Sequence, residues 1–256
     1  MILLMTLKPV IIFGGLPSVG SSTLAKRMAS SLDLEYVYVG KIFREMCIKE
    51  GHCDQNKMNT AEFEDQLSYY VNNILKNDKE VDMKVDAQIL KQIIDTDEPL
   101  LVEGRTISAL VTKQNINVVL KIWVKADINS RINRFKDKFP NIKWNEEHIK
   151  QTLLTRDKAD AQRYQKLYGI NLFKPENYND IIFDTTGLNV DQSYMALTTN
   201  PIFKEKIKKL FDFYPTYDVV YRWKCLVCGY TYEGFKPIKI CPNCGNIDPS
   251  KFQDLD

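Results

Sequence analysis

One short stretch constrains the fold more than any other part of the chain: residues 11–28, which read IIFGGLPSVGSSTLAKRM. An apolar run ends in a glycine-rich turn, and helix-forming residues follow. This order is typical of a phosphate-binding loop when the turn reads G-x-x-x-x-G-K-[ST]. Gly15, Gly20 and Ser22 fit that pattern, but Ser21 stands where it has lysine. The stretch is either a nucleotide site that works without its lysine, a site that has lost its chemistry, or an ordinary tight turn.

Strand-like and helix-like segments alternate over the first 195 residues. Strand-like runs lie at 10–13, 36–39, 100–103, 118–124 and 180–184, and helical periodicity at 22–32, 41–50, 60–76, 83–95, 127–138 and 146–168. Such alternation is typical of a parallel sheet covered by helices on both faces. We therefore expect an α/β fold with a sheet of the P-loop NTPase type. An amphipathic helix and a linker are expected to follow at 196–220.

Composition excludes some classes of function. The chain has 256 residues, 27% of them charged, and a net charge of +2, so no strong field favours nucleic acid or a membrane surface. Nothing approaches the ~18 consecutive apolar residues of a membrane span. The apolar start is interrupted by Lys8 and Pro9, which favours a first strand over a signal peptide. We expect a cytoplasmic protein without membrane or nucleic-acid partners, and the sequence leaves its oligomeric state open.

An acid and an arginine follow the third strand-like run. The run at 100–103 ends in Glu103-Gly104-Arg105, and open α/β sheets bind ligands at the carboxyl ends of their strands. Arg44 lies on the first turns of the helix after Gly40. Guanidinium groups fit phosphate oxygens in two-point contacts. Taken alone, Arg44 is better explained as a surface arginine that forms an ion pair with Glu45 or Glu50.

Two later helices each carry a pair of arginines on one face. Arg131 and Arg134 are three residues apart, and Arg156 and Arg163 are seven apart with Asp160 between them. Either helix alone is explained by ion pairs on a solvated surface. Together, after a phosphate loop, these arginines favour phosphoryl transfer, which depends mostly on positioning and on neutralising spread negative charge.

Several stretches, in order, carry a family resemblance: GLPSVGSSTLAKRMA, VGKIFREM, LLVEGR, LKIWVKADINSRINR, RDKADAQRYQKLYGIN and YNDIIFDT. The first 195 residues resemble the archaeal-type cytidylate kinases, within the nucleoside monophosphate kinases. The resemblance implies transfer of phosphate from Mg²⁺-ATP to CMP or dCMP. It also implies that Ser21 belongs to a working variant of the loop.

The resemblance assigns roles to individual residues. It places the ATP phosphates on the loop formed by Gly15, Leu16, Pro17, Ser18, Val19, Gly20, Ser21, Ser22 and Thr23. It places the acceptor on Gly40, Arg44, Glu103 and Arg105. The arginines that would close over the transferring group are Arg131, Arg134, Arg156 and Arg163.

The last 36 residues, 221–256, contain two C-x-x-C pairs: Cys225 with Cys228, and Cys241 with Cys244. Four thiolates at this spacing can form one tetrahedral site for zinc or iron. The segment resembles the rubredoxin-like domains of rubrerythrins. Because it is too short to bury a sufficient core, we expect metal to supply much of its folding energy.

Two smaller groups have open interpretations. Cys47, His52 and Cys53 could form a second metal site, although helix packing explains them better. Asp82 and Asp86 could contact the acceptor base or lie on an exposed acidic face. For the whole chain, a non-catalytic nucleotide sensor with a metal- or redox-responsive tail is the main alternative to a kinase. An RNA-associated protein is less favoured, because the tail lacks a dense basic stripe.

Overall fold

A computed structural model describes residues 6–58, 60–74, 79–138, 140, 145–211, 213, 221–234, 241–246 and 248–255. Its main feature is a five-stranded sheet in the order β2-β3-β1-β4-β5. The strands are β1 (Lys8–Gly15), β2 (Glu35–Tyr38), β3 (Leu100–Glu103), β4 (Val118–Lys125) and β5 (Ile181–Asp184). All four pairings are parallel, as the alternating sequence pattern predicts.

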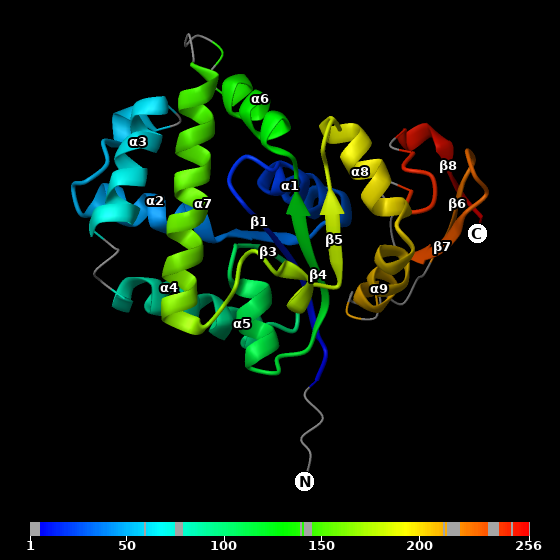
Figure 1. The fold of residues 1–256 in the computed structure, drawn as a ribbon. Helices are drawn as coiled ribbons and strands as arrows, with labels where there is room; N and C mark the ends of the chain where they lie inside the picture. Colours follow the sequence, from blue (N-terminus) through cyan, green and yellow to red (C-terminus); the bar gives the residue numbers. More distant parts are fainter. Residues whose placement is uncertain are drawn as a thin grey trace.

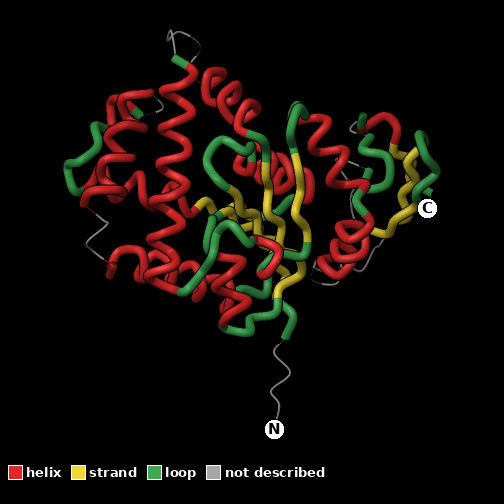
Figure 2. The backbone as a smooth tube through the Cα atoms, viewed as in Figure 1, coloured by secondary structure: helices red, strands yellow, loops and turns green. Residues whose placement is uncertain are grey.

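Helices cover both faces of this sheet (Figures 1 and 2). They are α1 (Ser21–Leu32), α2 (Val39–Lys49), α3 (Ala61–Tyr69), α4 (Lys79–Asp95), α5 (Ile107–Lys113), α6 (Ile128–Lys138), α7 (Glu146–Tyr168), α8 (Val190–Thr199) and α9 (Pro201–Phe211). One apolar core joins the sheet to α1, α8 and α9, and a second joins it to α4, α5 and α7. None of the helices in the described ranges is long and apolar enough to cross a membrane.

The central strand shows why this sequence forms a buried parallel sheet. Residues Val10 to Phe13 of β1 are all 0% exposed. Ile11 and Phe13 pack in the core with α1, whereas Val10 and Ile12 pack in the core with α4 and α5. Because side chains alternate along a strand, a continuous apolar run serves both faces. The neighbours of β1 are β3 and β4, so the chain reverses its winding direction at β1, where such sheets bind ligands.

The segment between the expected domains contains a core helix. In α9, Phe203, Ile207 and Leu210 are at most 2% exposed and belong to the core that includes α1. Figure 1 shows α9 beside α8 and the sheet. This helix is thus part of the α/β unit. Most of the expected linker after it lies outside the described residues.

Two segments differ from the sequence predictions. The helix expected over 60–76 ends at Tyr69 and continues as a π-helical turn, Tyr70–Ile74. Helix α5 was not predicted, because its seven residues are mostly buried and show no amphipathic period. Short buried helices of this kind cannot be told from strands by periodicity.

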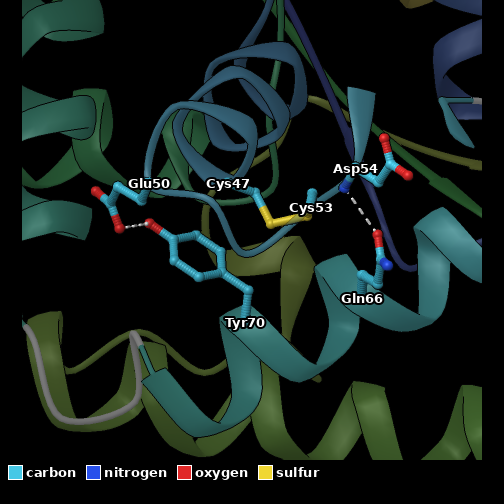
Figure 3. Close-up of a disulfide and its surroundings, with 6 residues drawn as sticks. All are labelled: Cys47, Glu50, Cys53, Asp54, Gln66 and Tyr70. Atoms are coloured by element: carbon cyan, nitrogen blue, oxygen red, sulfur yellow. Dashed lines mark hydrogen bonds between the residues drawn. A yellow bond between two sulfur atoms is a disulfide. The ribbon is translucent and has the colours of Figure 1, made fainter. Parts of the chain in front are cut away.

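A disulfide that sequence reasoning missed links α2 to the turn that follows it. Cys47 and Cys53 form the bond, and both are buried against Phe63, Leu67 and Tyr70. Figure 3 shows two hydrogen bonds beside it, from the Tyr70 hydroxyl to Glu50 and from the Asp54 N–H to Gln66. The suggested metal site at these cysteines is therefore wrong. The turn after α2 brings the two close together, since the Cys53 N–H donates to the Cys47 carbonyl at 3.1 Å.

The last part of the chain is a three-stranded antiparallel ribbon in the order β7-β6-β8. Its strands are β6 (Tyr221–Cys225), β7 (Thr231–Gly234) and β8 (Phe252–Asp254). It lies next to α8 and α9 (Figure 1). "Ribbon" below means the described residues from 221 onward.

Candidate nucleotide site and metal centre

The turn after β1 takes a backbone conformation that depends on its glycines. A Cβ atom on Gly15 would lie 2.6 Å from Val19 Cγ2 and 2.8 Å from the Val124 carbonyl oxygen. Gly20 has φ 89° and immediately precedes α1, and Ser18 also has a positive φ of 61°. These left-handed positions curve the main chain around the start of the helix, where amide groups and the helix dipole favour an anion.

Ser21, at the lysine position, contacts an acid. Its hydroxyl donates to Glu103 Oε1 at 3.1 Å, and Ser21 is only 7% exposed. Glu103 is also buried, and its Oε2 has no hydrogen-bond partner among the described residues. Burial raises the pKa of this carboxyl, which the hydroxyls of Ser21 and Ser22 partly offset. A buried carboxylate oxygen beside the Ser22 hydroxyl suits a hard cation such as Mg²⁺.

Arg131 is held between α7 and the loop. Its two terminal nitrogens donate to Asp157 at 2.7 and 2.8 Å, and its Nε donates to the Pro17 carbonyl at 2.8 Å. It is 4% exposed. Every nitrogen of this guanidinium thus has a protein partner.

Arg134, one turn later on α6, has a similar arrangement. Nη1 donates to the Val19 carbonyl at 2.8 Å, and Nη2 donates to the carbonyls of Thr185 and Leu188 at 2.6 and 3.1 Å. The sequence prediction had both arginines close over the transferring group. That role stays a prediction; in this structure Arg131 and Arg134 donate to the loop carbonyls of Pro17 and Val19.

Three other guanidinium groups lie around Tyr38. Arg44 donates to the Tyr38 hydroxyl at 2.7 Å, to the Gly40 carbonyl at 3.1 Å and to Glu64 at 3.1 Å. Arg105 forms an ion pair with Asp160. Glu64, rather than the expected Glu45 or Glu50, is thus the acid that pairs with Arg44.

Arg156 completes this group without an ion pair to any described residue. Burial, and next the charge of Arg105, lower the pKa of Arg156. The charges of Asp160, Glu64 and Tyr38 raise this pKa in part. A buried cation beside another cation favours an anionic ligand, because such a ligand would relieve both repulsion and desolvation.

A second polar cluster lies deeper, between α4, α5 and α7. Asp82 and Asp86 are 1% and 5% exposed, so the expectation of an exposed acidic face is wrong. Asp86 accepts hydrogen bonds from Tyr168 at 2.7 Å and Thr106 at 3.4 Å, and burial raises its pKa to about 6. Arg163 lies 3.6 Å from Asp82, while its Nε has no hydrogen-bond partner among the described residues.

The four ribbon cysteines converge as their spacing predicts. All four Sγ atoms lie within 4.8 Å of one another. The Gly229 N–H donates to the Cys225 carbonyl and the Gly245 N–H to the Cys241 carbonyl, both at 2.8 Å. Both glycines have a positive φ, 74° and 73°, which lets each C-x-x-C segment turn tightly. Four thiols at this separation fit one tetrahedral zinc or iron ion.

Comparison with known proteins finds one family match for the α/β unit and another for the ribbon. Residues 10–186 match the family model described as "Cytidylate kinase-like family", and residues 223–253 match "Rubrerythrin, rubredoxin-like domain". The chain belongs to the cytidylate kinase-like family. The part of it described from residue 6 to residue 213 is called the kinase domain below.

Curated relatives span nearly the same length as this domain. The cytidylate kinase of Methanosarcina mazei is 32% identical over 70% of this chain and 88% of its own. That of Methanopyrus kandleri is 29% identical over 73% of this chain and 90% of its own. A solved but uncharacterized protein from Eubacterium ventriosum shares the fold, with a TM-score of 0.50 and 13% identity over 79% of this chain and 98% of its own.

Purified protein should contain one metal ion per chain, because four thiolates form a single closed site. Elemental analysis after anaerobic purification measures this directly. An iron-loaded ribbon should be coloured by thiolate-to-iron charge transfer, whereas a zinc-loaded one should be colourless. Replacing Cys241 with serine should abolish stoichiometric metal, and its retention would contradict the assignment.

Proposed function

We propose that this protein transfers the γ-phosphoryl group of ATP to CMP, giving CDP and ADP. The observation that carries the proposal is that Glu103 connects the glycine loop with a group of arginines. The hydroxyls of Ser21 and Ser22 at the start of α1 hydrogen-bond to Glu103, and the charges of Arg105 and Arg44 act on it. The charge of Arg105 acts in turn on Arg156. The curated relatives that match the kinase domain are cytidylate kinases, which supports CMP as the acceptor.

In the proposed reaction an oxygen of the acceptor phosphate attacks the γ-phosphorus, and the bridging oxygen leaves with ADP. The acceptor is already an anion, so the chain has to position and neutralise charge rather than remove a proton. The loop amides would hold the ATP phosphates. Arg44 and Arg105 would hold the acceptor phosphate, and Arg156 would lie nearest the transferring group.

A magnesium ion would be held by the Ser22 hydroxyl and by the carboxylate of Glu103. When bound there, it supplies positive charge to the β- and γ-phosphates. Ser21 supplies no charge of its own. Its hydroxyl instead fixes one oxygen of Glu103, leaving the buried Oε2 as the atom directed at the cation, directly or through water.

The deeper cluster supports cytosine over uracil. Cytosine presents two acceptors, O2 and N3, beside an amino donor at N4. Arg163 could donate to the acceptors, and Asp82 or Asp86 could accept from the amino group. Uracil has an N3–H donor and an O4 acceptor at the corresponding positions, so the same groups would face it with the wrong polarity.

A panel of CMP, dCMP, UMP and AMP with Mg²⁺-ATP tests the acceptor. We expect CMP to give the highest kcat/KM, since only the cytosine nucleotides match the cluster in hydrogen-bond polarity. Coupled measurement of ADP release provides the rates. Faster turnover of AMP than of CMP would contradict the proposal. No turnover of any acceptor, together with tight ATP binding, would favour the sensor alternative.

Arg156→Ala should lower kcat/KM for CMP at least tenfold, because a charged phosphate contact contributes about 1.5–3 kcal/mol. Its thermal stability should change little, since Arg156 has no ion pair to lose within the described residues. Arg105→Ala should lower turnover as much but also destabilise the fold, because it removes one of the two guanidinium groups that pair with the buried Asp160. The exposed Lys158, on the same helix, provides the control Lys158→Ala. Unchanged kinetics in Arg156→Ala would remove this residue from the site.

Ser21→Lys should not raise turnover, because the new ammonium group would reach the buried Glu103 and pair with it. The variant Ser21→Ala serves as the control, since it removes the hydroxyl without adding charge. Steady-state kinetics with CMP and ATP compare the three proteins. A rise of about a hundredfold in Ser21→Lys, equivalent to roughly 2.7 kcal/mol, would mean that serine cripples the loop.

A further inference from the structure

The ribbon contacts the kinase domain through its second C-x-x-C turn, Cys241–Gly245. A Cβ atom on Gly245 would lie 3.1 Å from Met195 Cγ of α8, so the backbone of the turn rests on that side chain. Beside it, Lys204 of α9 donates to Asn243 Oδ1 at 3.3 Å. Figure 1 shows the ribbon next to both helices. The contact surface is therefore formed by α8 and α9.

The residues that make this contact also shape half of the metal site. The Gly245 N–H that donates to the Cys241 carbonyl belongs to the residue that rests on Met195. In each C-x-x-C pair the first cysteine is buried, Cys225 at 1% and Cys241 at 0% exposed, and the second is more exposed. Of the two turns, the second supplies the contact with Met195 and Lys204. Loss of metal would release the turn that forms the contact.

Helix α8 is in turn attached to the helix that starts at the phosphate loop. Arg27 of α1 lies over the Tyr194 ring, 4.8 Å from its centroid, and forms an ion pair with Asp191. Leu24 and Met28 share a buried core with Tyr194. Because α1 begins at Ser21, a displacement of α8 changes the packing of the element that positions the loop amides.

We propose that metal binding in the ribbon and nucleotide binding in the loop are energetically coupled through the contact of residues 241–245 with α8. The metal orders the turn, the turn supports α8, and α8 fixes α1. The proposal rests on the nucleotide site of the proposed function. Coupling of this kind is reciprocal, so a nucleotide must raise metal affinity by the factor by which the metal raises nucleotide affinity.

The test uses the full chain and zinc as the probe metal. Zinc affinity is measured by competition with a chelator, with and without a saturating non-hydrolysable ATP analogue and Mg²⁺. We expect at least about fivefold tighter zinc binding with the analogue, the lower end of common coupling strengths. Analogue affinity, measured by calorimetry on zinc-loaded and metal-free chain, should change by the same factor.

Met195→Lys should keep both affinities measurable but reduce the coupling factor to about one, because it disrupts the contact without touching either site. The control is Ile202→Lys, a similarly exposed apolar residue of α9, which should retain the coupling. Equal zinc affinity with and without a bound analogue would overturn the proposal. Coupling that persists in Met195→Lys would overturn the route through α8. If the analogue binds neither form of the chain, the proposed function fails instead.

Discussion

The buried ion pair between Arg131 and Asp157 is the contact on which the nucleotide site depends. It links α6 to α7 and, through Arg131 Nε, to the Pro17 carbonyl of the loop. Removing one partner of such a buried pair costs about 3–5 kcal/mol, since the other charge is left without compensation. The loop therefore has a fixed shape without a lysine reaching across it. Arg134 adds three further carbonyl contacts from the same helix.

A loop lysine would both support the shape of the loop and supply positive charge, and in this arrangement different residues do the two. Loop shape is maintained from outside by Arg131 and Arg134, which donate to the carbonyls of Pro17 and Val19. In the proposed function, positive charge comes from Arg44, Arg105 and Arg156. Ser21 adds no charge and donates to Glu103 instead. A non-catalytic sensor has no need for such an arginine group, and the net charge of +2 gives no strong overall field toward RNA.

Sequence reasoning could predict the parallel sheet, the glycine loop and the four-cysteine site, because each follows from local spacing or alternation. It could not predict which acid each arginine contacts. The partners Asp157 and Arg131 are 26 residues apart, and Arg105 and Asp160 are 55 apart, so only tertiary packing selects them. The burial of Asp82 and Asp86 was hidden for the same reason. The Cys47–Cys53 disulfide had one available signal, two cysteines six residues apart across a glycine-containing turn.

Calorimetric binding of ATP and of ADP to Arg134→Gln tests the central claim, that the α6 arginines act by shaping the loop. The control is Lys136→Gln, on the same helix, whose ammonium group pairs with Glu146 and not with the loop. Loop amides hold the phosphates that ATP and ADP share. The account therefore predicts that Arg134→Gln weakens both nucleotides by the same factor. A loss confined to ATP would instead place this guanidinium on the γ-phosphate and contradict the account.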